Sequence, residues 1–489
     1  MMNNSDLSIV ILCAGNGTRM RSQKPKVLHT LAGKTLIERV VETASLLEPK
    51  KIILVHNPEH RTQLEDLLQN LPITWVAQTE RRGTGHAVLQ ALPYIETKQS
   101  LVLYGDVPLL PQNLLTTLQE QTATQFGMIT ARTPRPHGFG RIIRDEKNNI
   151  IRIVEEKDAD ASTKLIEEIN TGIMLFPTQF LQESLPKLEP KNAQGEYYLT
   201  DCVALWQEKS IPVKSVSATC FWHIQGVNTQ AELVHLERTW MRYQAEKLLE
   251  QGVRITDPER FDIHGNLICE NDITISPNVC IKDHCEIGEN STIGNNCSLN
   301  RVRIGKNVVI GNFCELENVH IEDNAKIDSF SKLENTLVGQ HAKVGPYAYV
   351  RPGTKIGNHA KLGAFVEAKN SELEYGSKVA HLSYVGDCKI GENSNIGAGF
   401  VHANYHGPHR EKSTSSIGKN AFIGANCTIV SPITIGEDST VGAGTTVRKN
   451  VADNAMHVTL GKEVTKENWQ EQEQPSPSNN EENSSLQTL

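Results

Sequence analysis

The chain has 489 residues, a net charge of -8 and 22% charged residues, which excludes a broad basic surface for nucleic acid or membranes. The length is enough for about three domains. The first apolar run, Leu7 to Leu12, is too short for a signal sequence, and no run reaches the roughly 18 apolar residues of a membrane-spanning helix. The ten cysteines include no Cys-x-x-Cys pair, which favours reduced thiols. We therefore expect a cytoplasmic protein that neither inserts into membranes nor binds nucleic acid.

Apolar strands alternate with helical segments through the first 230 residues. This alternation predicts an α/β, Rossmann-like domain with a mostly parallel sheet. The expected strands are Ser8–Cys13, Lys51–Val55, Ile73–Ala77, Leu101–Tyr104 and Gly127–Ala131.

A single amphipathic helix is expected next, over residues 231–251. Leu233, Leu236, Trp240 and Tyr243 recur at helical spacing in a charged background. We interpret this segment as a linker between the α/β domain and the region that follows.

Residues 252–456 carry aliphatic side chains six positions apart, a period that fits neither an ordinary helix nor an ordinary strand. An isolated pair would indicate only a strand and a turn, but long series in one phase predict a parallel β-helix. The two longest series are Val338, Val344, Val350, Ile356, Leu362 and Ile417, Ile423, Ile429, Ile435, Val441, Val447. A segment from His402 to Ser416 breaks the period and is expected to be a functional loop. We expect the C-terminal segment, residues 457–489, to be disordered from about Gln470.

The strand Ser8–Cys13 leads into a glycine loop of the kind that approaches phosphates. Gly15 and Gly17 allow close backbone approach, and Arg19 and Lys26 supply cations. The loop lacks the third glycine of a dinucleotide fingerprint and the Gly-Lys-Ser/Thr of a P-loop. On its own it would be only a tight turn with solvated cations.

Other polar groups are expected at the same edge of the sheet. Asp106 ends a buried strand, and strand C-termini form the ligand crevice of parallel sheets. Amide, carboxylate and glycine groups recur at comparable strand or loop ends, at Gln78, Gly83–His86, Gly138–Gly140, Glu155, Asn170–Gly172 and Gly226–Asn228. Together they predict a nucleotide and sugar pocket with one site for a hard cation.

The β-helix also carries candidate site residues. Arg351 and Lys369 are cations at expected coil turns, suited to a sugar phosphate. His381, Ser383 and Val385 are expected on alternate positions of one strand, and the loop Asn404–Gly407 projects from the stack. The alternative is a β-helix that serves only as a trimerisation rod, in which His381 is a structural histidine.

The motifs Ala14–Met20, Pro25–Lys26, Tyr104–Asp106 and Gly195–Asp201, with Asn228, resemble one known family. It is the family of bifunctional N-acetylglucosamine-1-phosphate uridylyltransferases and glucosamine-1-phosphate acetyltransferases. The resemblance covers nearly the whole chain and implies a left-handed β-helix, a homotrimer and synthesis of UDP-N-acetylglucosamine for cell-wall and lipopolysaccharide precursors.

The resemblance implies a role for each matching residue of the first domain. Asp106 and Asn228 would bind Mg²⁺, while Arg19 and Lys26 would stabilise the charge of the reacting phosphates. UTP and the UDP-sugar would be held by Leu12, Ala14, Gly15, Lys26, Gln78, Gly83, Thr84, Tyr104, Gly105, Asp106, Gly140, Glu155, Asn170 and Asn228.

In the β-helix, the resemblance implies that His381 is the general base for acetyl transfer, with Glu367 as its orienting partner. Glucosamine-1-phosphate would be bound by Arg351, Lys369, Tyr384 and Asn395. Acetyl-CoA would be bound, across a trimer interface, by Ala398, Asn404, Tyr405, Ala425 and Ala443.

The sequence departs from the family pattern mainly in this second half. Ala425 stands where serine is common, Phe400 and His402 replace small hydroxyl residues, and Asn370 replaces a lysine. His406 and Thr459 stand where an aspartate and an arginine are usual, and in the first half Cys13 replaces an alanine.

Two alternatives to this function stay open. One is a uridylyltransferase whose β-helix is only a scaffold, and the other is a nucleotide-sugar sensor or assembly subunit without catalysis. A zinc carbonic anhydrase of the hexapeptide class is disfavoured because no three histidines occupy matching positions on adjacent coils.

Overall fold

The computed structural model describes residues 6–407, 411–461 and 465. The chain divides into two compact units, Met1–Pro352 and Gly353–Leu489. The division falls within the hexad series, so each unit contains part of the β-helix. The assignment of residues 1–230, 231–251 and 252–456 to separate functional domains remains a proposal from the sequence.

The first unit contains a nine-stranded mixed sheet whose main path runs β11-β7-β10-β6-β1-β4-β5. β1 pairs in parallel with β4 on one side and β6 on the other, while β10 runs antiparallel to β6 and β7. The strands are β1 Leu7–Cys13, β4 Lys51–His56, β5 Ile73–Ala77, β6 Gln99–Tyr104, β7 Gly127–Arg132, β8 Arg141–Arg144, β9 Ile150–Val154, β10 Glu168–Pro177 and β11 Lys214–Ala218. All five predicted strands are confirmed.

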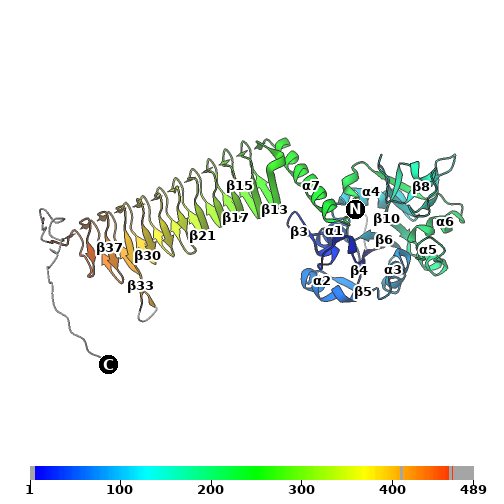
Figure 1. Ribbon diagram of the computed structural model, residues 1–489, viewed down its shortest axis with the longest axis horizontal. Coiled ribbons are helices and arrows are strands. Elements are labelled where there is room, and N and C mark those ends of the chain that lie inside the picture. The colour runs from blue at the N-terminus through cyan, green and yellow to red at the C-terminus, as the bar shows by residue number, and fades with distance from the viewer. Residues whose placement is uncertain (1–5, 408–410, 462–464, 466–489) are drawn as a thin grey trace, which may run out of the picture. The chain divides into compact units, whose positions relative to one another are not determined.

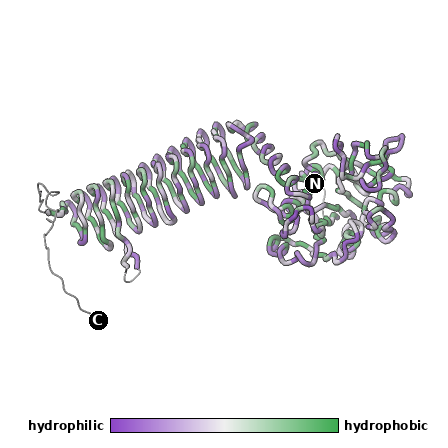
Figure 2. Tube along the Cα trace, in the orientation of Figure 1, coloured by the Kyte–Doolittle hydropathy of each residue, from purple (hydrophilic) through white to green (hydrophobic). Residues whose placement is uncertain are grey.

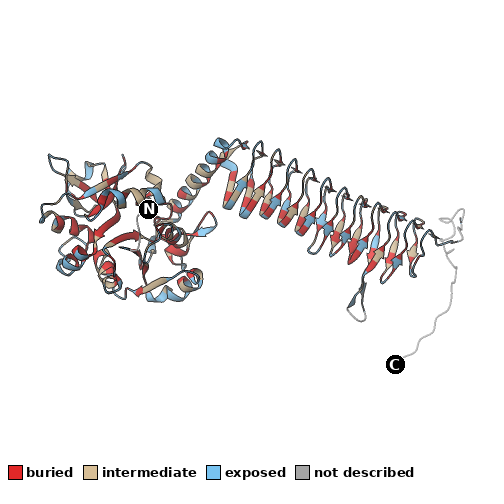
Figure 3. Ribbon diagram, turned by 180° about the vertical axis from the view of Figure 1, so that it is seen from behind, coloured by how far each residue is buried: buried red, intermediate tan, exposed pale blue. Residues whose placement is uncertain are grey.

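Alternate residues of the central strands fill two hydrophobic cores, one on each face of the sheet. Ile9 and Ile11 pack with α1, α2 and α4, whereas Val10 packs with α3. The helices are α1 Leu36–Ser45, α2 Arg61–Leu68, α3 Thr84–Ala91, α4 Gln112–Thr122, α5 Thr178–Ser184 and α6 Cys202–Gln207. Figure 3 shows the buried strands between helices whose outer sides are exposed. The sheet edge that carries the strand C-termini is thereby held rigid.

The predicted amphipathic helix is α7, Gln230–Glu250. Thr229 caps it, and the side chain of Glu232 accepts hydrogen bonds from the backbone N–H groups of Asn228 and Thr229. This capping box fixes Asn228 at the start of the helix. Among the described residues, none of the helices has both the length and the apolar character needed to span a bilayer.

The first unit also contains the early coils of the β-helix. Long strands pair in parallel along their length, as in β13 with β15, and a second sheet of two-residue strands runs beside them. The strands are β13 Phe261–Cys269, β15 Val279–Ile287, β17 Ser298–Ile304, β19 Glu315–Ile321, β21 Lys332–Val338 and β23 Tyr349–Val350, with β12 Arg254–Ile255, β14 Thr274–Ile275, β16 Thr292–Ile293, β18 Val309–Ile310, β20 Lys326–Ile327 and β22 Lys343–Val344.

The second unit contains further hexads in shorter strands, whose parallel pairs form three faces. Figure 1 shows the coils of these strands. One face contains β26 Glu367–Lys369, β29 Tyr384–Gly386, β32 Val401–Ala403, β37 Thr428–Val430 and β40 Thr446–Val447; the second contains β25 Lys361–Leu362, β28 Lys378–Val379, β31 Asn395–Ile396, β36 Phe422–Ile423, β39 Thr440–Val441 and β41 Met456–His457; the third contains β24 Lys355–Ile356, β27 Glu372–Leu373, β30 Cys388–Ile390, β35 Ser415–Ile417 and β38 Thr434–Ile435. The predicted hexad residues are all buried, and Figure 2 shows the alternation of hydrophobic and hydrophilic residues along the coils. The expected fold class, an α/β domain followed by a parallel hexapeptide β-helix, is confirmed.

The segment that breaks the hexad period is shorter than predicted. Val401, His402 and Ala403 belong to β32 and pair in register with β37, so the break begins at Asn404 and not at His402. The interruption folds as a hairpin of β33 Tyr405–His406 and β34 Glu411–Lys412, which leaves the coils (Figure 1). The tail from Gln470, for which disorder is expected, lies outside the described residues.

Candidate functional site

A cavity of about 550 Å³ opens beside the C-terminal ends of β1 and β6 in the first unit. The strand order reverses direction at β1, and ligands bind at such a switch point in open α/β sheets. The predicted residues that line the cavity are Leu12, Ala14, Gly15, Arg19, Lys26, Gln78, Gly83, Thr84, Tyr104 and Asp106. Most of the predicted nucleotide-binding set is therefore brought together.

Glycines leave room for a ligand to approach the protein backbone at this cavity. No heavy atom lies within 4 Å of the place where a Cβ on Gly15 would stand, whereas Gly17, with φ of 59°, faces the side chain of Lys26. Gly83 has φ of 103°, and a Cβ there would come within 2.6 Å of the carbonyl of Tyr197. Gly83 and Thr84, at the start of α3, line the cavity, while the N–H of Gly85 donates to the carbonyl of Tyr197.

Lys26, Asp106, Asn228 and Arg19 form one charged cluster at the cavity wall. The Lys26 ammonium contacts Asp106 Oδ2 and donates to Asn228 Oδ1 at 3.1 Å, and Arg19 donates to the same oxygen at 2.9 Å. Asp106 and Asn228 therefore direct two oxygens at one cation, the ligand type that Mg²⁺ prefers. The pair fits a magnesium ion that keeps water and phosphate oxygens as its remaining ligands. The described residues contain no cluster of three or more His, Cys, Asp or Glu side chains suited to a metal.

The predicted sugar-binding residues lie next to one another around Tyr104. Asn170 donates its backbone N–H to the Gly140 carbonyl at 2.8 Å, and Glu155 Oε1 accepts from Thr200 Oγ1 at 3.2 Å. Burial raises the pKa of Glu155 and also that of Tyr104. A half-buried carboxylate with one hydroxyl donor has free acceptor capacity for sugar hydroxyls.

The structure adds Arg81 and Glu196 to the predicted lining. Arg81 is in the segment that precedes Gly83, and Glu196 is in the Gly195–Asp201 motif. Both residues therefore lie beside predicted site residues, but the sequence did not indicate a role for either side chain.

Cys13 also lines the cavity, but its thiol donates to the carbonyl of Val55. Burial raises its pKa, so the thiolate that alkylation requires is disfavoured.

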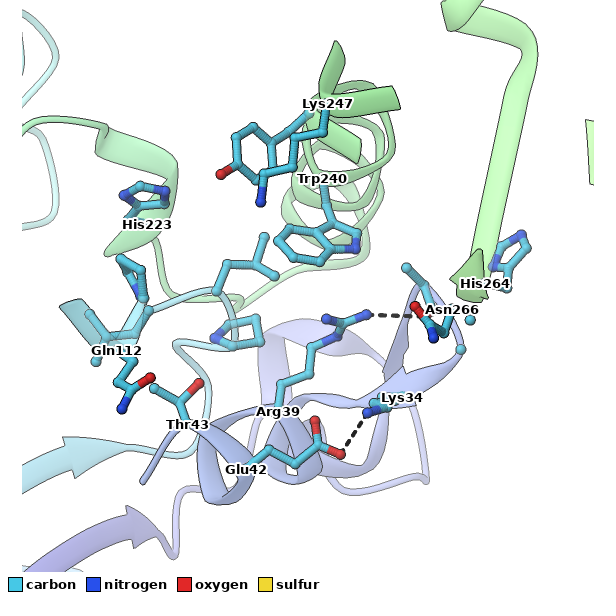
Figure 4. Close-up of a pocket in the computed structure, with 18 of the residues that line it drawn as sticks. Lys34, Arg39, Glu42, Thr43, Gln112, His223, Trp240, Lys247, His264 and Asn266 are labelled. Atoms are coloured by element: carbon cyan, nitrogen blue, oxygen red, sulfur yellow. Dashed lines mark hydrogen bonds and ion pairs between the residues drawn. The ribbon is translucent and has the colours of Figure 1, made fainter. Parts of the chain in front are cut away.

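A larger cavity of the first unit, about 1070 Å³, lies apart from these residues. Figure 4 shows it between α1, α7 and the first coils, with Arg39, Trp240 and Lys247 at its wall. The Arg39 guanidinium lies 5.1 Å from the Trp240 ring centroid and donates to the carbonyls of Leu31 and Ala32, while Lys34 pairs with Glu42. The charged groups at α1 are thus already partnered within the protein, and no predicted site residue lines this cavity.

In the second unit, Lys369, Glu367 and Tyr384 share one outer face of the β-helix. Glu367 pairs with Tyr384 and Lys369 with Gly386 in the register of β26 and β29, and the residues between them, Ala368 and Val385, point into the core. The face therefore presents a carboxylate, an ammonium and a phenol on adjacent coils. Arg351 belongs to the first unit, where its guanidinium lies 5.8 Å from the Tyr349 ring centroid.

His381 lies at the corner that leads into this face, not on the strand as predicted. The strand begins at Tyr384, while Ser383 is buried and donates its hydroxyl to the His381 carbonyl at 2.8 Å. The imidazole itself is exposed. Backbone bonds from Gly399 to His381, from Asn426 to Ala398 and from Gly444 to Ala425 align three of the predicted acetyl-CoA positions, Ala398, Ala425 and Ala443, at this corner of successive coils.

Asn404 and Tyr405 lie at the opposite end of the same face, where the hairpin leaves the coil. Asn404 is buried and Tyr405 is exposed. Asn395 is not gathered with them, because it belongs to β31, which pairs with β28 and β36 on another face. A cavity of about 810 Å³ in this unit is lined by none of the predicted site residues.

Aromatic side chains are exposed in a stack at one corner of the coils in the first unit. The rings of Phe313 and Phe330 are 5.0 Å apart and nearly parallel, and those of Phe330 and Tyr347 are 4.8 Å apart. Their exposed fractions are 52%, 47% and 47%. In the second unit Phe365 and Leu382 are likewise exposed. We call Phe313, Phe330 and Tyr347 the aromatic ladder.

Comparison with known proteins matches three segments to families. Residues 9–186 match the MobA-like NTP transferase domain, residues 263–354 the GMPPB C-terminal domain, and residues 415–449 the hexapeptide repeat of succinyl-transferase. The chain is 42% identical over 465 residues to the bifunctional protein GlmU of Alcanivorax borkumensis, which covers 95% of this chain and 98% of that protein.

Two further relatives give the same result. The bifunctional protein GlmU of Acinetobacter baylyi is 41% identical over 465 residues, and that of Neisseria meningitidis serogroup C is 42% identical over 469 residues. In each case 98% of the relative's length is covered. Because the similarity spans the nucleotide pocket and the β-helix alike, the chain belongs to the family of bifunctional GlmU proteins.

Proposed function

We propose that the chain acetylates glucosamine-1-phosphate on the β-helix and then transfers UMP from UTP to the product in the α/β domain, giving UDP-N-acetylglucosamine and pyrophosphate. The observation that carries this proposal is the presence of both sets of predicted residues in one chain that matches the bifunctional family over its length. Small-molecule substrates and a cytoplasmic location follow from this function.

For uridylyl transfer, the residues at the 550 Å³ cavity position two anions and neutralise their charge. The phosphate oxygen of the sugar attacks the α-phosphorus of UTP, a new P–O bond forms, and the bond to pyrophosphate breaks. Lys26 and Arg19 would stabilise the phosphates, and no protein nucleophile is required. Glu155 and Asn170 would bind the sugar.

A bound Mg²⁺, held by Asp106 and Asn228, would withdraw charge from the phosphate oxygens. Lys26 contacts both of these side chains in the described structure. We propose that the Lys26 ammonium turns toward the phosphates when the metal binds, because two cations so close together repel each other.

For acetyl transfer, the amine nitrogen of glucosamine-1-phosphate attacks the thioester carbonyl, the C–N bond forms and the C–S bond breaks. His381 would take the proton from the nitrogen as the general base, because its imidazole is exposed at the corner that leads into this face. The thiol of coenzyme A leaves with a proton. Lys369 and Arg351 would bind the sugar phosphate, Tyr384 would contact the sugar, and Glu367 would orient the base.

We propose a homotrimer for two reasons. Asn395 lies on a different face from Lys369 and Tyr384, so one chain does not gather all four predicted sugar-phosphate ligands, whereas a neighbouring copy could supply the missing group. The aromatic ladder exposes a continuous apolar stripe, and such surfaces mark sites of association.

The two activities can be tested in one preparation. The purified chain is assayed with glucosamine-1-phosphate, acetyl-CoA, UTP and Mg²⁺, with one component omitted at a time, while free thiol and pyrophosphate are measured. Both products should appear, and acetylated sugar phosphate should yield pyrophosphate without acetyl-CoA. Thiol release at the background rate would disprove acetyl transfer and leave the scaffold alternative.

The variant His381→Ala separates the two sites. General-base removal lowers rates by about 10²–10⁴-fold, so thiol release should fall by that factor while pyrophosphate release is unchanged. Raising the pH should restore part of the rate, because the amine then loses its proton to solvent. An unchanged rate of thiol release would identify His381 as structural.

A further inference from the structure

His402 is a fully buried histidine in the interior of the β-helix, with an exposed fraction of 0%. It is the central residue of β32 and pairs with Ile429 of the next coil. Ala368, Val385, Ile429 and Val447 occupy the same inward column. A polar ring in an aliphatic column is not explained by packing alone, since buried polar groups cost free energy unless they are hydrogen-bonded.

One nitrogen of the ring makes a hydrogen bond and the other does not. Nδ1 contacts the backbone carbonyl of Gly386, and because a carbonyl can only accept, Nδ1 carries the proton. Nε2 has no hydrogen-bond partner among the described residues. Burial lowers the pKa of the ring, and the Asp387 carboxylate acts in the opposite direction with a smaller effect. The ring is therefore a neutral donor fixed in one tautomer.

The carbonyl that accepts from His402 belongs to Gly386. Two side chains with predicted ligand-binding roles, Tyr384 and Asn404, lie next to this residue. A Cβ on Gly386 would collide with the Tyr384 hydroxyl and with Asn404 Nδ2. On the outer face, Gly386 thus separates a predicted sugar contact from a predicted acetyl-CoA contact. On the inner side, its carbonyl accepts the hydrogen bond from His402.

The neighbouring corner is fixed by amides around one carboxylate. Asp387 accepts from Asn404 Nδ2 at 2.5 Å and from Asn370 Nδ2 at 2.6 Å. The peptide that joins Gly386 to Asp387 is thereby fixed at its carbonyl end by His402 and on its Asp387 side by two side chains. Without the first contact, the Gly386 carbonyl would be buried beside an apolar core, and the peptide could rotate to find another donor.

We infer that His402 is a positioning residue for acetyl transfer: its Nδ1–H holds the Gly386 carbonyl from inside the coil and so fixes the Tyr384 hydroxyl relative to the Asn404 amide. The inference rests on the proposed roles of Tyr384 and Asn404. It predicts an effect on turnover, because a displacement of about 1 Å between reacting groups can cost about 10²-fold in rate.

Three single-residue variants of the full chain test this role. His402→Leu fills the column without a donor, whereas His402→Asn places an amide N–H near the position of Nδ1. Phe400→Leu is the matched control, because Phe400 is fully buried in the same coil and its side chain has no polar atom. The kcat and both KM values of acetyl transfer, the rate of uridylyl transfer and the thermal midpoint are measured for each.

We expect His402→Leu to lower the kcat of acetyl transfer by at least tenfold, with uridylyl transfer unchanged and the thermal midpoint unchanged or raised. His402→Asn should recover to within about threefold of the unaltered chain, and Phe400→Leu should keep its kcat within the same limit. Equal losses in His402→Leu and His402→Asn, or in His402→Leu and Phe400→Leu, would overturn the inference. So would a His402→Leu variant with normal kcat.

A spectroscopic measurement examines the contact independently of activity. In the chain labelled with ¹⁵N-histidine, the resonances that disappear in His402→Leu should be those of an imidazole protonated at Nδ1 and bare at Nε2. A proton on Nε2 would overturn the inference. If the unaltered chain has no acetyl transfer at all, the proposed function fails; if it is active and His402→Leu is equally active, only the role of His402 fails.

Discussion

The nucleotide pocket and the β-helix face gather their side chains in different ways. At the pocket, strand ends and loops from distant parts of the sequence converge on one cavity of about 550 Å³. On the β-helix, residues spaced by one coil lie on successive rungs of an outer face. A sheet edge can enclose a small ligand by itself, whereas a solenoid face presents groups at the spacing of its coils, about 4.8 Å. The second site therefore depends more on what covers it.

Removal of a single charge should disrupt the pocket, because Lys26 is its central cation. We expect Lys26→Met to lower uridylyl transfer by about 10²–10³-fold, the usual cost of removing one group that stabilises transition-state charge. Acetyl transfer should be unchanged. The measurement is pyrophosphate release at saturating UTP, with Lys98→Met as a control because Lys98 is an exposed partner of Asp6. A decrease in the rate of less than threefold would show that Lys26 does not stabilise the transition state.

The β-helix site should instead be sensitive to its oligomeric state. Phe330→Glu places a charge in the middle of the aromatic ladder, where Phe330 stacks on both neighbours. If the ladder lies between copies, the variant should sediment as a smaller species and lose acetyl transfer by at least tenfold, with uridylyl transfer retained. Val309→Glu is the control, because Val309 is 42% exposed on β18 and is not a residue of the ladder. A trimeric Phe330→Glu variant would show that the ladder faces solvent.

Glu155 tests how the pocket combines stability with binding. Burial raises the pKa of Glu155. Between the unfolded pKa of about 4.3 and this raised pKa, the folded state therefore binds more protons than the unfolded state. The free energy of unfolding falls as the pH rises through that interval. Glu155→Gln removes this charge and keeps an acceptor for Thr200.

We expect Glu155→Gln to raise the free energy of unfolding by on the order of 0.5–1 kcal/mol and the KM for N-acetylglucosamine-1-phosphate by about tenfold, because a charged acceptor is lost. Thermal unfolding and initial rates measure the two effects. A variant that is less stable than the parent would show that the Glu155 carboxylate is fully satisfied by the protein.

The difference between the two regions also explains what the sequence could predict. The period of six specifies the β-helix directly, because each aliphatic residue such as Ile417 must point inward on its own coil. The nucleotide site was predictable because the glycine loop and Asp106 follow strand ends, and strand ends meet at one edge. Asp106 and Asn228 were predicted as a pair, but their shared contact with Lys26 depends on side-chain geometry that no motif contains.

Three features of the β-helix were not predictable for a related reason. The sequence predicts an interruption that begins at His402, yet backbone pairing with β37 keeps this residue in register. The alternation of His381, Ser383 and Val385 predicts one strand, whereas the strand begins at Tyr384. The separation of Asn395 from Lys369 follows from which face each hexad occupies, and a period of six does not distinguish the faces.

We also expect His402 to make the stability of the β-helix depend on pH, and this is the smallest of the expected effects. Its pKa is lowered in the folded state, so below pH ~6.5 the unfolded chain binds one proton more than the folded chain. Stability is therefore lost as the pH falls from about 6.5 toward the folded pKa, by at most about 1.4 kcal/mol per pH unit. In His402→Leu this contribution is absent, and the thermal midpoint of the acetyl-transfer region should fall less steeply between pH 6.5 and 5. Phe400→Leu, which changes a buried apolar residue of the same coil, should keep the slope of the unaltered chain; the same slope in all three proteins would mean that His402 accepts a proton in the folded coil.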